Sequence, residues 1–193
     1  MSDVQFHEIE AKPGEEPRRI AFRTTPGAGP TLVFLPGYMS DMDGGKATAL
    51  FAEAQEQGRA GLLLDYSGCG QSSGDFADGT LSRWREEALA LIEAYTIGPV
   101  LLVGSSMGGW LMLLVAEELR GSATHPLAGI IGIAPAPDFT TWGFSDEQRA
   151  VMSAGQTIYE ENPYGPEPTP THPGFFADGE DCLTLGGPIA LDA

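Results

Sequence analysis

The stretch "VLLVGSSMGGWLMLLVAEELRG", residues 100–121, joins two apolar blocks through a cluster of glycines and serines. The first block, 100–104, is short and rich in Val and Leu, and such a run predicts a buried β-strand. The second block, 109–120, is apolar on nearly every side until Glu117, which predicts a deeply buried helix, and Gly121 suits its C-terminal end. The stretch therefore predicts a strand, a tight turn and a helix, in that order.

The same alternation of strands and helices recurs along the chain. Apolar runs rich in Val, Ile and Leu alternate with longer segments of helical periodicity, which is typical of a mainly parallel sheet covered by helices on both faces. We therefore assign the chain to the α/β class. The expected strands are 4–9, 18–24, 31–35, 61–65, 100–104 and 129–134, and the expected helices are 45–57, 81–95 and 109–120.

The composition limits the architecture and the partners. With 193 residues and 42% hydrophobic content, the chain is long enough for one compact core, so a single domain over 1–193 is expected. A net charge of −17 repels phosphate backbones and anionic lipid, which argues against nucleic acid as a partner. The longest apolar run, 110–116, is far shorter than the roughly 18 residues that indicate a membrane span, and the first residues show no secretory signal. These features predict a soluble, cytoplasmic protein.

Two segments match the pattern G-x-S-x-G, which places a serine on a sharp turn between a strand and a helix and exposes its hydroxyl as a nucleophile. The segment "GSSMG", 104–108, centres on Ser106, and "GQSSG", 70–74, centres on Ser72. Ser106 alone follows a predicted strand and precedes a predicted helix. We therefore expect Ser106 to be the catalytic nucleophile and Ser72 to belong to a turn; for Ser106 the alternative is a plain tight turn.

A serine nucleophile needs donors that stabilise the oxyanion formed in the reaction. The backbone amide of Met107, at the N-terminus of the predicted helix, is one expected donor. A second is expected from the turn after the strand 31–35, where the amide of Tyr38 follows Gly37. Preorganised donors of this kind typically lower a barrier by about 3 kcal/mol. Ser106, Tyr38 and Met107 are therefore the candidate site residues.

Three segments resemble those of α/β-hydrolases in their order and spacing. They are "FLPGYMSDMDGGKA" (34–47), "LDYSGCGQSSGDFADGT" (64–80) and "VGSSMGGWLMLL" (103–114). They look most like the group of small serine esterases and thioesterases related to palmitoyl-protein thioesterase and acyl-glucuronide esterase. The resemblance covers essentially the whole chain and implies an eight-stranded, mostly parallel sheet. It also implies Ser106 as nucleophile, with main-chain donors at Tyr38 and Met107.

The partners of the nucleophile are harder to place. A serine needs a histidine to take its proton and a carboxylate to orient that histidine, and in this fold the acid and the histidine follow the serine in the chain. Asp138 and His172 satisfy that order, whereas His125 is expected on the surface. The resemblance instead places both residues on loops after the seventh and eighth strands, and "CLTLGGPIALDA", 182–193, resembles the segment before the seventh. We therefore expect a C-terminally truncated domain that lacks the last two strands and whose catalysis is impaired.

The segment 138–175 differs from the rest of the domain because it is rich in proline and aromatic residues, so it cannot continue the sheet. It is either a lid over a pocket or a surface excursion tethered by its aromatic side chains. These are Phe139, Trp142, Phe144, Tyr159 and Tyr164. Without two terminal strands, the strand 129–134 becomes a bare sheet edge, which predicts self-association.

Other polar residues and the cysteines receive structural interpretations. Two cysteines make no disulfide framework, and no Cys/His cluster has metal-ligand spacing, so neither a metal nor a cofactor is expected. Cys69 is interpreted as a small, partly buried filler and Asp65 as an acceptor for loop amides. Asp41 and Asp43 are expected to cap the helix 45–57 rather than to reach the mouth of the pocket.

Three functions remain open. The first is a serine hydrolase that cleaves esters or thioesters of acyl substrates through an acyl-Ser106 intermediate, with a small-molecule substrate as its partner. The second is a catalytically silent binding module of the same fold. The third is a nucleotide-binding domain, suggested by "GCGQSSG", 68–74, and it is the weakest because a serine stands at position 73 and a loop follows instead of a helix.

Overall fold

The computed structural model describes residues 3–12, 14, 16–162, 165–189 and 191. Within these residues, six strands form the main sheet, in the order β1-β2-β4-β3-β5-β6. They are β1 (Gln5–Ile9), β2 (Arg18–Thr25), β3 (Ala28–Leu35), β4 (Arg59–Leu64), β5 (Val100–Ser105) and β6 (Leu127–Ile133). The β1–β2 and β2–β4 pairs are antiparallel, and the remaining three pairs are parallel. The sheet is therefore mostly parallel with an antiparallel side at the N-terminal end of the chain.

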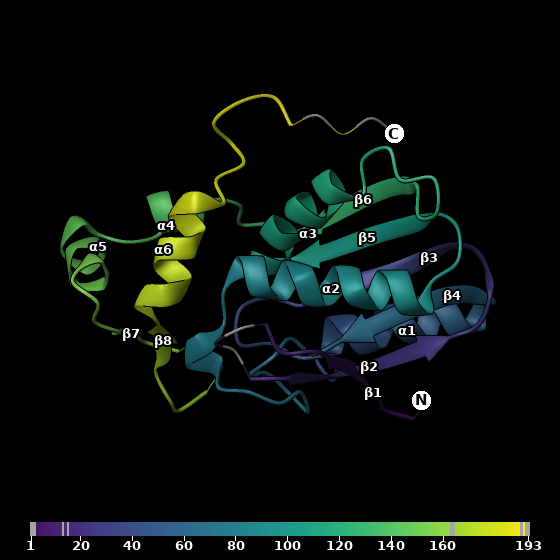
Figure 1. The fold of residues 1–193 in the computed structure, drawn as a ribbon, viewed down its shortest axis with the longest axis horizontal. Coiled ribbons are helices and arrows are strands. Elements are labelled where there is room, and N and C mark those ends of the chain that lie inside the picture. Colours follow the sequence, from purple (N-terminus) through teal and green to yellow (C-terminus); the bar gives the residue numbers. More distant parts are fainter. Residues whose placement is uncertain (1–2, 13, 15, 163–164, 190, 192–193) are drawn as a thin grey trace.

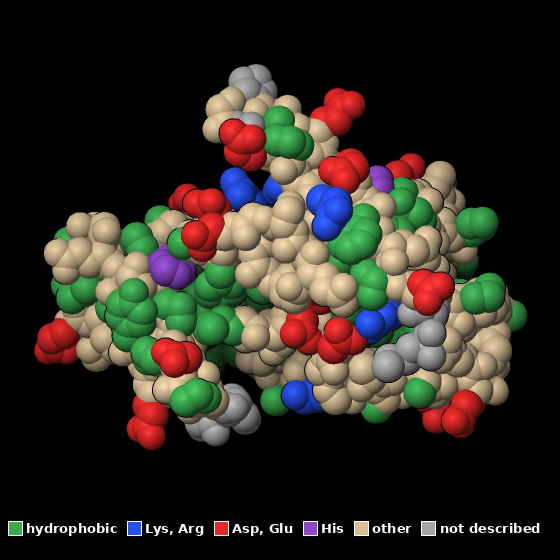
Figure 2. All heavy atoms as spheres, turned by 90° about the horizontal axis from the view of Figure 1, so that it is seen from below, with side chains coloured by type: hydrophobic (Ala, Val, Ile, Leu, Met, Phe, Trp, Pro, Cys, Tyr) green, Lys and Arg blue, Asp and Glu red, His purple; other side chains and the backbone are tan. Residues whose placement is uncertain are grey.

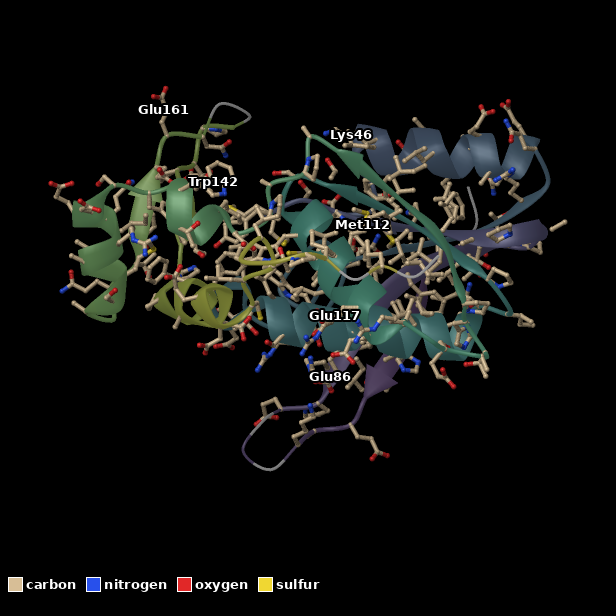
Figure 3. The ribbon with its side chains drawn as sticks, turned by 90° about the horizontal axis from the view of Figure 1, so that it is seen from above. Lys46, Glu86, Met112, Glu117, Trp142 and Glu161 are labelled. Carbon is tan, nitrogen blue, oxygen red and sulfur yellow. The ribbon has the colours of Figure 1, made fainter. Side chains whose placement is uncertain are left out.

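Helices cover both faces of the sheet. α1 (Gly45–Glu56) lies on one face, and α2 (Leu81–Tyr95) and α3 (Met107–Glu118) lie on the other, as Figure 3 shows from above. Neighbouring residues of a strand point to opposite faces. In β4, Leu63 packs in the cluster on the α1 side, while Leu62 and Leu64 pack in the cluster on the side of α2 and α3. Each face of the sheet thus has its own apolar core.

The predicted α/β class is confirmed, and the nine predicted strands and helices are all present with bounds that differ by at most three residues. The helix 81–95 has the predicted bounds because Thr80 caps it: the Thr80 hydroxyl accepts a hydrogen bond from the Arg83 amide at 3.1 Å. Its regularly spaced apolar residues Leu81 and Trp84 are fully buried. The largest difference is at β3, which begins at Ala28.

The expected capping of α1 by Asp41 and Asp43 is wrong. The N-cap residue is Gly44, and among the described residues no side chain accepts a hydrogen bond from the first turn. Asp43 instead pairs with Arg23 of β2 at 2.5 Å, and the Asp41 carboxylate accepts the Asp43 amide at 3.0 Å. The amides that open α1 are therefore left for other acceptors, since the first turn of a helix has none of its own.

Beyond the sheet, residues 138–182 form a cap segment of short elements. These are α4 (Phe139–Trp142), α5 (Asp146–Ser153), β7 (Ile158–Glu160), β8 (Thr169–Thr171) and α6 (Pro173–Asp181). As the sequence predicted, the described part of the segment does not extend the main sheet; there, β7 and β8 pair only with each other. Figure 1 shows the cap segment on the left, beyond the carboxyl end of β5. In Figure 2 hydrophobic side chains gather over this end of the molecule.

The cap segment is joined to the main domain by specific contacts. The ring of Phe175 packs against Tyr38 with the centroids 4.9 Å apart, and the Asp178 carboxylate accepts the Ser82 amide at 2.9 Å at the start of α2. Of the aromatic residues expected to tether this segment, Phe139 packs on Trp110 of α3, while Tyr164 lies outside the described residues. Whether the segment acts as a lid stays a prediction.

His125 is not on the surface, contrary to expectation. Only 6% of the residue is exposed. Its Nδ1 atom lies 3.1 Å from the Thr96 hydroxyl and its Nε2 atom 3.2 Å from Glu93. His125 thus contacts the C-terminal end of α2. Among the described residues, no helix has the length and apolarity needed to cross a bilayer.

Candidate active site

Ser106 occupies the turn between β5 and α3 and has an unusual backbone conformation. Its φ of 53° and ψ of −122° lie in a region that L-residues rarely adopt, and its side chain is exposed while both neighbours are buried. Such a conformation costs roughly 1–3 kcal/mol and persists only where the surrounding structure imposes it. The hydroxyl of Ser106 therefore stands out at the carboxyl end of the sheet, where open α/β folds place their ligands.

Three backbone hydrogen bonds hold this turn. The Ser106 amide donates to the Ile133 carbonyl at 3.1 Å, and the Ser106 carbonyl accepts from the amides of Gly109 at 2.8 Å and Ala136 at 3.0 Å. Ile133 and Ala136 belong to the end of β6 and the loop after it. The neighbouring parallel strand thus fixes the conformation of the serine.

The glycines around Ser106 are required by close backbone contacts. A Cβ atom at Gly104 would lie 2.3 Å from the Gly108 carbonyl oxygen, and one at Gly108 would lie 2.1 Å from the Leu35 carbonyl oxygen. Both distances are far below van der Waals contact, so a side chain at either position would displace backbone. The two glycines of the G-x-S-x-G pattern therefore let α3 begin directly against the end of β3.

Both amides expected as oxyanion donors are available. Met107 is the first residue of α3, so its amide has no acceptor within the helix. The Tyr38 amide lies in the turn after β3, and neither amide donates a hydrogen bond to another described residue. The Tyr38 side chain anchors this turn: its hydroxyl donates to the Pro170 carbonyl at 3.0 Å, and burial raises the pKa of the phenol.

Two pockets meet at Ser106. One has a volume of about 550 Å³ and the more polar lining of the two; its described lining residues are Gly37, Tyr38, Met39, Ser40, Lys46, Ser105, Ser106, Asn162 and Thr169. The other, of about 270 Å³, is mostly apolar and is lined by Tyr38, Ser106, Met107, Ala136, Phe139, Trp142, Gly143, Phe144, Glu160, Thr169 and Thr171. We call them the polar pocket and the apolar pocket. The cap segment contributes residues to both, so Ser106 lies between the main domain and the cap segment.

Ser72 is a structural residue, as expected. Its hydroxyl donates to the Asp65 carbonyl at 2.7 Å and accepts from the Ala21 amide at 2.8 Å. The neighbouring carboxylate of Asp65 accepts the amides of Met42 at 2.7 Å and Gln71 at 2.8 Å, and burial raises its pKa. Both residues hold the loop after β4 to its neighbours. A loop and no α-helix follows the "GCGQSSG" segment directly, and this removes the basis for a dinucleotide site there.

The Asp138 and His172 pair does not meet Ser106. The Asp138 carboxylate accepts the amides of Thr184 at 2.8 Å and Leu185 at 2.7 Å, so it fastens the chain after α6. The Nδ1 atom of His172 lies 3.0 Å from the Thr157 hydroxyl. Neither residue lines the two pockets at Ser106. In the described part of the chain, the nucleophile candidate has no histidine beside it.

Sequence reasoning missed the residues that give the polar pocket its character. Lys46 supplies its charge, and Thr169 comes from β8 of the cap segment. Lys46 lies within the "FLPGYMSDMDGGKA" segment, but nothing in a single lysine distinguishes a pocket residue from an ordinary surface one. Cys69, by contrast, is buried as expected, and burial raises the pKa of its thiol to about 12.

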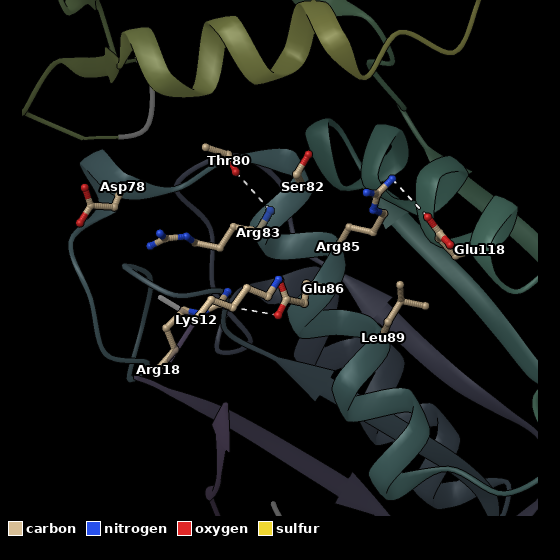
Figure 4. A pocket seen from close by; sticks show the side chains of 10 residues that line it. All are labelled: Lys12, Arg18, Asp78, Thr80, Ser82, Arg83, Arg85, Glu86, Leu89 and Glu118. Atoms are coloured by element: carbon tan, nitrogen blue, oxygen red, sulfur yellow. Dashed lines mark hydrogen bonds and ion pairs between the residues drawn. The ribbon is translucent and has the colours of Figure 1, made fainter. Parts of the chain in front are cut away.

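Another cavity, of about 520 Å³, lies between β2 and α2 and does not include Ser106. Figure 4 shows its charged lining: Lys12 pairs with Glu86 at 2.6 Å, and Arg85 pairs with Glu118 at 3.5 Å. Arg18 also contacts Glu86, at 3.2 Å. These opposite charges largely neutralise one another, so we assign a structural role to this cavity. Among the described residues, no group of three or more His, Cys, Asp or Glu is arranged to hold a metal ion.

The fold and the turn at Ser106 define an α/β-hydrolase. A family model described as the alpha/beta hydrolase family matches residues 32–190, and the chain belongs to that family. Human mitochondrial palmitoyl-protein thioesterase ABHD10 is 32% identical over 182 residues, which cover 90% of this chain and 56% of the human protein. The mouse protein of the same name is 40% identical over 119 residues, covering 62% of this chain and 39% of its own length. The matches thus span 56% of the human relative and 39% of the mouse relative.

Solved structures give the same result. A putative hydrolase from Agrobacterium vitis S4 superposes with a TM-score of 0.86 at 36% identity, covering 96% of this chain and 74% of that one. Mouse alpha/beta hydrolase domain-containing protein 10 superposes with a TM-score of 0.80 at 30% identity, covering 97% and 74%. The resemblance inferred from the three sequence segments is therefore confirmed.

Proposed function

We propose that this chain is a serine hydrolase that cleaves esters or thioesters of acyl substrates through an acyl-Ser106 intermediate. The observation that carries the proposal is the exposed Ser106 hydroxyl on a strained turn at the N-terminus of α3. The names of the relatives, palmitoyl-protein thioesterases, support an acyl thioester as substrate. The apolar pocket beside Ser106 supports the same class, because aromatic linings accept hydrocarbon chains.

In the proposed reaction, the Ser106 oxygen attacks the acyl carbonyl carbon. The carbonyl oxygen becomes an oxyanion that accepts hydrogen bonds from the amides of Tyr38 and Met107, and the positive end of the α3 dipole adds to this stabilisation. The bond to the leaving thiol or alcohol then breaks, and the leaving group takes up a proton as the serine loses one. Water cleaves the acyl-serine, releasing the acid and restoring the hydroxyl.

The rate is expected to be low. Activation of a serine requires a base, and no described histidine lines the pockets at Ser106. The oxyanion donors and substrate binding alone leave roughly 1,000-fold catalysis over water in serine hydrolases that lack triad members. We therefore propose slow acylation of Ser106, with the proton passing to solvent.

A fluorophosphonate probe tests this proposal. Peptide mapping after labelling is expected to find the adduct on Ser106 and not on Ser72, and the Ser106→Ala variant is expected to lose it. Equal labelling of the parent chain and the variant would show that another residue is the nucleophile.

A catalytically silent binding module of the same fold is the second candidate. The absence of a histidine from the described lining of both pockets favours it. Turnover of an aryl acetate discriminates between the two: hydrolysis above the level of Ser106→Ala supports the hydrolase, and binding without any hydrolysis supports the module.

A further inference from the structure

The two pockets at Ser106 differ in charge. Among the described lining residues, Lys46 is the charged residue of the polar pocket, and Glu160 is that of the apolar pocket. The chain has a net charge of −17 and only ten Lys and Arg residues. A positively charged side chain beside the nucleophile therefore contrasts with the net negative charge of the protein.

The Lys46 ammonium is available for a ligand. Its side chain is exposed, and it makes no ion pair or hydrogen bond with any other described residue. Glu160, by contrast, accepts a hydrogen bond from the Gln148 side chain at 3.1 Å. Figure 3 shows Lys46 at the end of α1 that faces the cap segment, across from Trp142. The two labelled residues thus mark the polar and the apolar side of the site.

Backbone and hydroxyl donors accompany this cation. Lys46 is the second residue of α1, so its backbone lies at the positive end of the helix dipole; Gly44 and Gly45, which begin the helix, line a small cavity next to the polar pocket. Ser105 lines the polar pocket with 6% of its surface exposed, and its hydroxyl makes no hydrogen bond to a described residue. A serine hydroxyl in the lining of a pocket can donate a hydrogen bond to a ligand.

The carboxylates that precede Lys46 in the sequence have partners of their own. Asp43 pairs with Arg23, and one oxygen of Asp41 accepts the Asp43 amide. Asp41 does share a small cavity of about 70 Å³ with Lys46 and Ser105. It does not line the polar pocket itself.

We propose that the polar pocket binds a compact oxyanion, a phosphate or a carboxylate, carried by the leaving group of the substrate. This inference rests on the proposed function, because the leaving group is defined by the acyl-Ser106 step. The acyl chain occupies the apolar pocket, and the leaving thiol or alcohol projects toward Lys46 and the Ser105 hydroxyl. A lysine ammonium is a common partner of phosphate and carboxylate oxygens.

A binding experiment tests the subsite without requiring catalysis. The probes are phenyl phosphate, benzoate and the neutral benzamide, titrated into the intact chain and followed by amide NMR shifts. We expect both anions to bind more tightly than benzamide, with shifts at Lys46 and Ser105. Lys46→Gln should weaken anion binding about fivefold, the upper range for an exposed ion pair.

Arg59→Gln is the matched control because it removes the same charge from an exposed residue at the start of β4, at the opposite end of the sheet. It should change anion binding by less than twofold. Tighter binding of phenyl phosphate identifies a phosphate site, and tighter binding of benzoate a carboxylate site. Equal affinity for the anions and benzamide, or an equal effect of the two substitutions, would overturn the proposal.

Kinetics then connects the subsite with the reaction. The substrates are 4-acetoxybenzoate and 4-acetoxybenzamide, whose acyl groups are identical and whose leaving groups differ in charge. The ratio of their kcat/KM values, corrected for alkaline hydrolysis, should fall about fivefold in Lys46→Gln and be retained in Lys46→Arg. If neither substrate turns over above Ser106→Ala, the proposed function fails while the binding result still decides the subsite.

Discussion

Gly37 faces Ser106 so closely that a Cβ atom at residue 37 would lie 3.4 Å from the Cβ atom of Ser106 and 3.2 Å from the Ser105 carbonyl oxygen. The turn that carries the Tyr38 amide therefore packs directly on the nucleophile candidate. A larger residue at position 37 should push this turn away from Ser106 without disturbing the apolar core on either face of the sheet.

Gly37→Val is expected to slow labelling of Ser106 at least tenfold, because the Tyr38 amide would move away from the oxyanion position. Gly45→Ala serves as control, since a Cβ atom there meets nothing within 4 Å. The measurement is the rate of fluorophosphonate labelling. A rate in Gly37→Val equal to that in Gly45→Ala would contradict this role of the turn.

Ser106→Gly is expected to stabilise the fold while abolishing labelling. The backbone of Ser106 is strained at a φ of 53°, and glycine relieves that strain at a smaller cost in unfolded-state entropy. We expect the free energy of unfolding to rise by about 1 kcal/mol in urea titration. Ser105→Gly, at a residue without positive φ, should lower it. A loss of stability in Ser106→Gly would show that the turn is unstrained.

Cys69 should resist alkylation in the folded chain. Burial raises the pKa of its thiol to about 12, so at pH 8.5 the thiolate is scarce; unfolding should speed modification by iodoacetamide about a thousandfold. Because the folded pKa lies above the ordinary value of 9.0, the associated stability is complete below pH 9 and is lost as the pH rises toward 12. Cys69→Ala should remove this part of the alkaline loss of stability. Equally fast alkylation of folded and unfolded chains would show that the Cys69 side chain is not buried.

The β6 edge should make this chain self-associate. In the described structure β6 pairs with β5 alone, and Ile131 on it is 49% exposed. Unpaired strand edges pair with other chains unless charged residues prevent it. Sedimentation should show association that grows with concentration, and Ile131→Lys should reduce it. A monomer at all concentrations would contradict this prediction.

The sequence predicted the main sheet because its signals are local. The helix 81–95 has regular apolar spacing and a threonine cap, and the glycines around Ser106 mark close contacts that the structure contains. The sequence did not reveal functional residues whose role depends on which residues lie near them in the folded chain. Lys46 is an ordinary exposed lysine until the fold brings the polar pocket to it.

The cap segment was predicted as a lid or a surface excursion without assigned helices, although two of its helices carry recognisable signals. Ser145 and Gln148 form a capping box at the start of α5, and Pro173 stands at the first position of α6. His125 was misplaced for a different reason: its burial depends on Thr96 and Glu93, which are distant in the sequence. No pattern in one sequence indicates such contacts.

The pH profile of alkylation of the Ser106→Cys variant tests the central claim most directly, because it needs no catalytic base. If residue 106 projects from the N-terminus of α3 toward free amides, the new thiol should have a pKa below 7.5, since helix N-termini lower thiol pKa values to about 3.5–7.5. Ser153→Cys, exposed at the last residue of α5, is the control and should titrate at 8.5 or above. A titration midpoint for Ser106→Cys at or above that of the control, or no modification in the folded chain, would contradict the account.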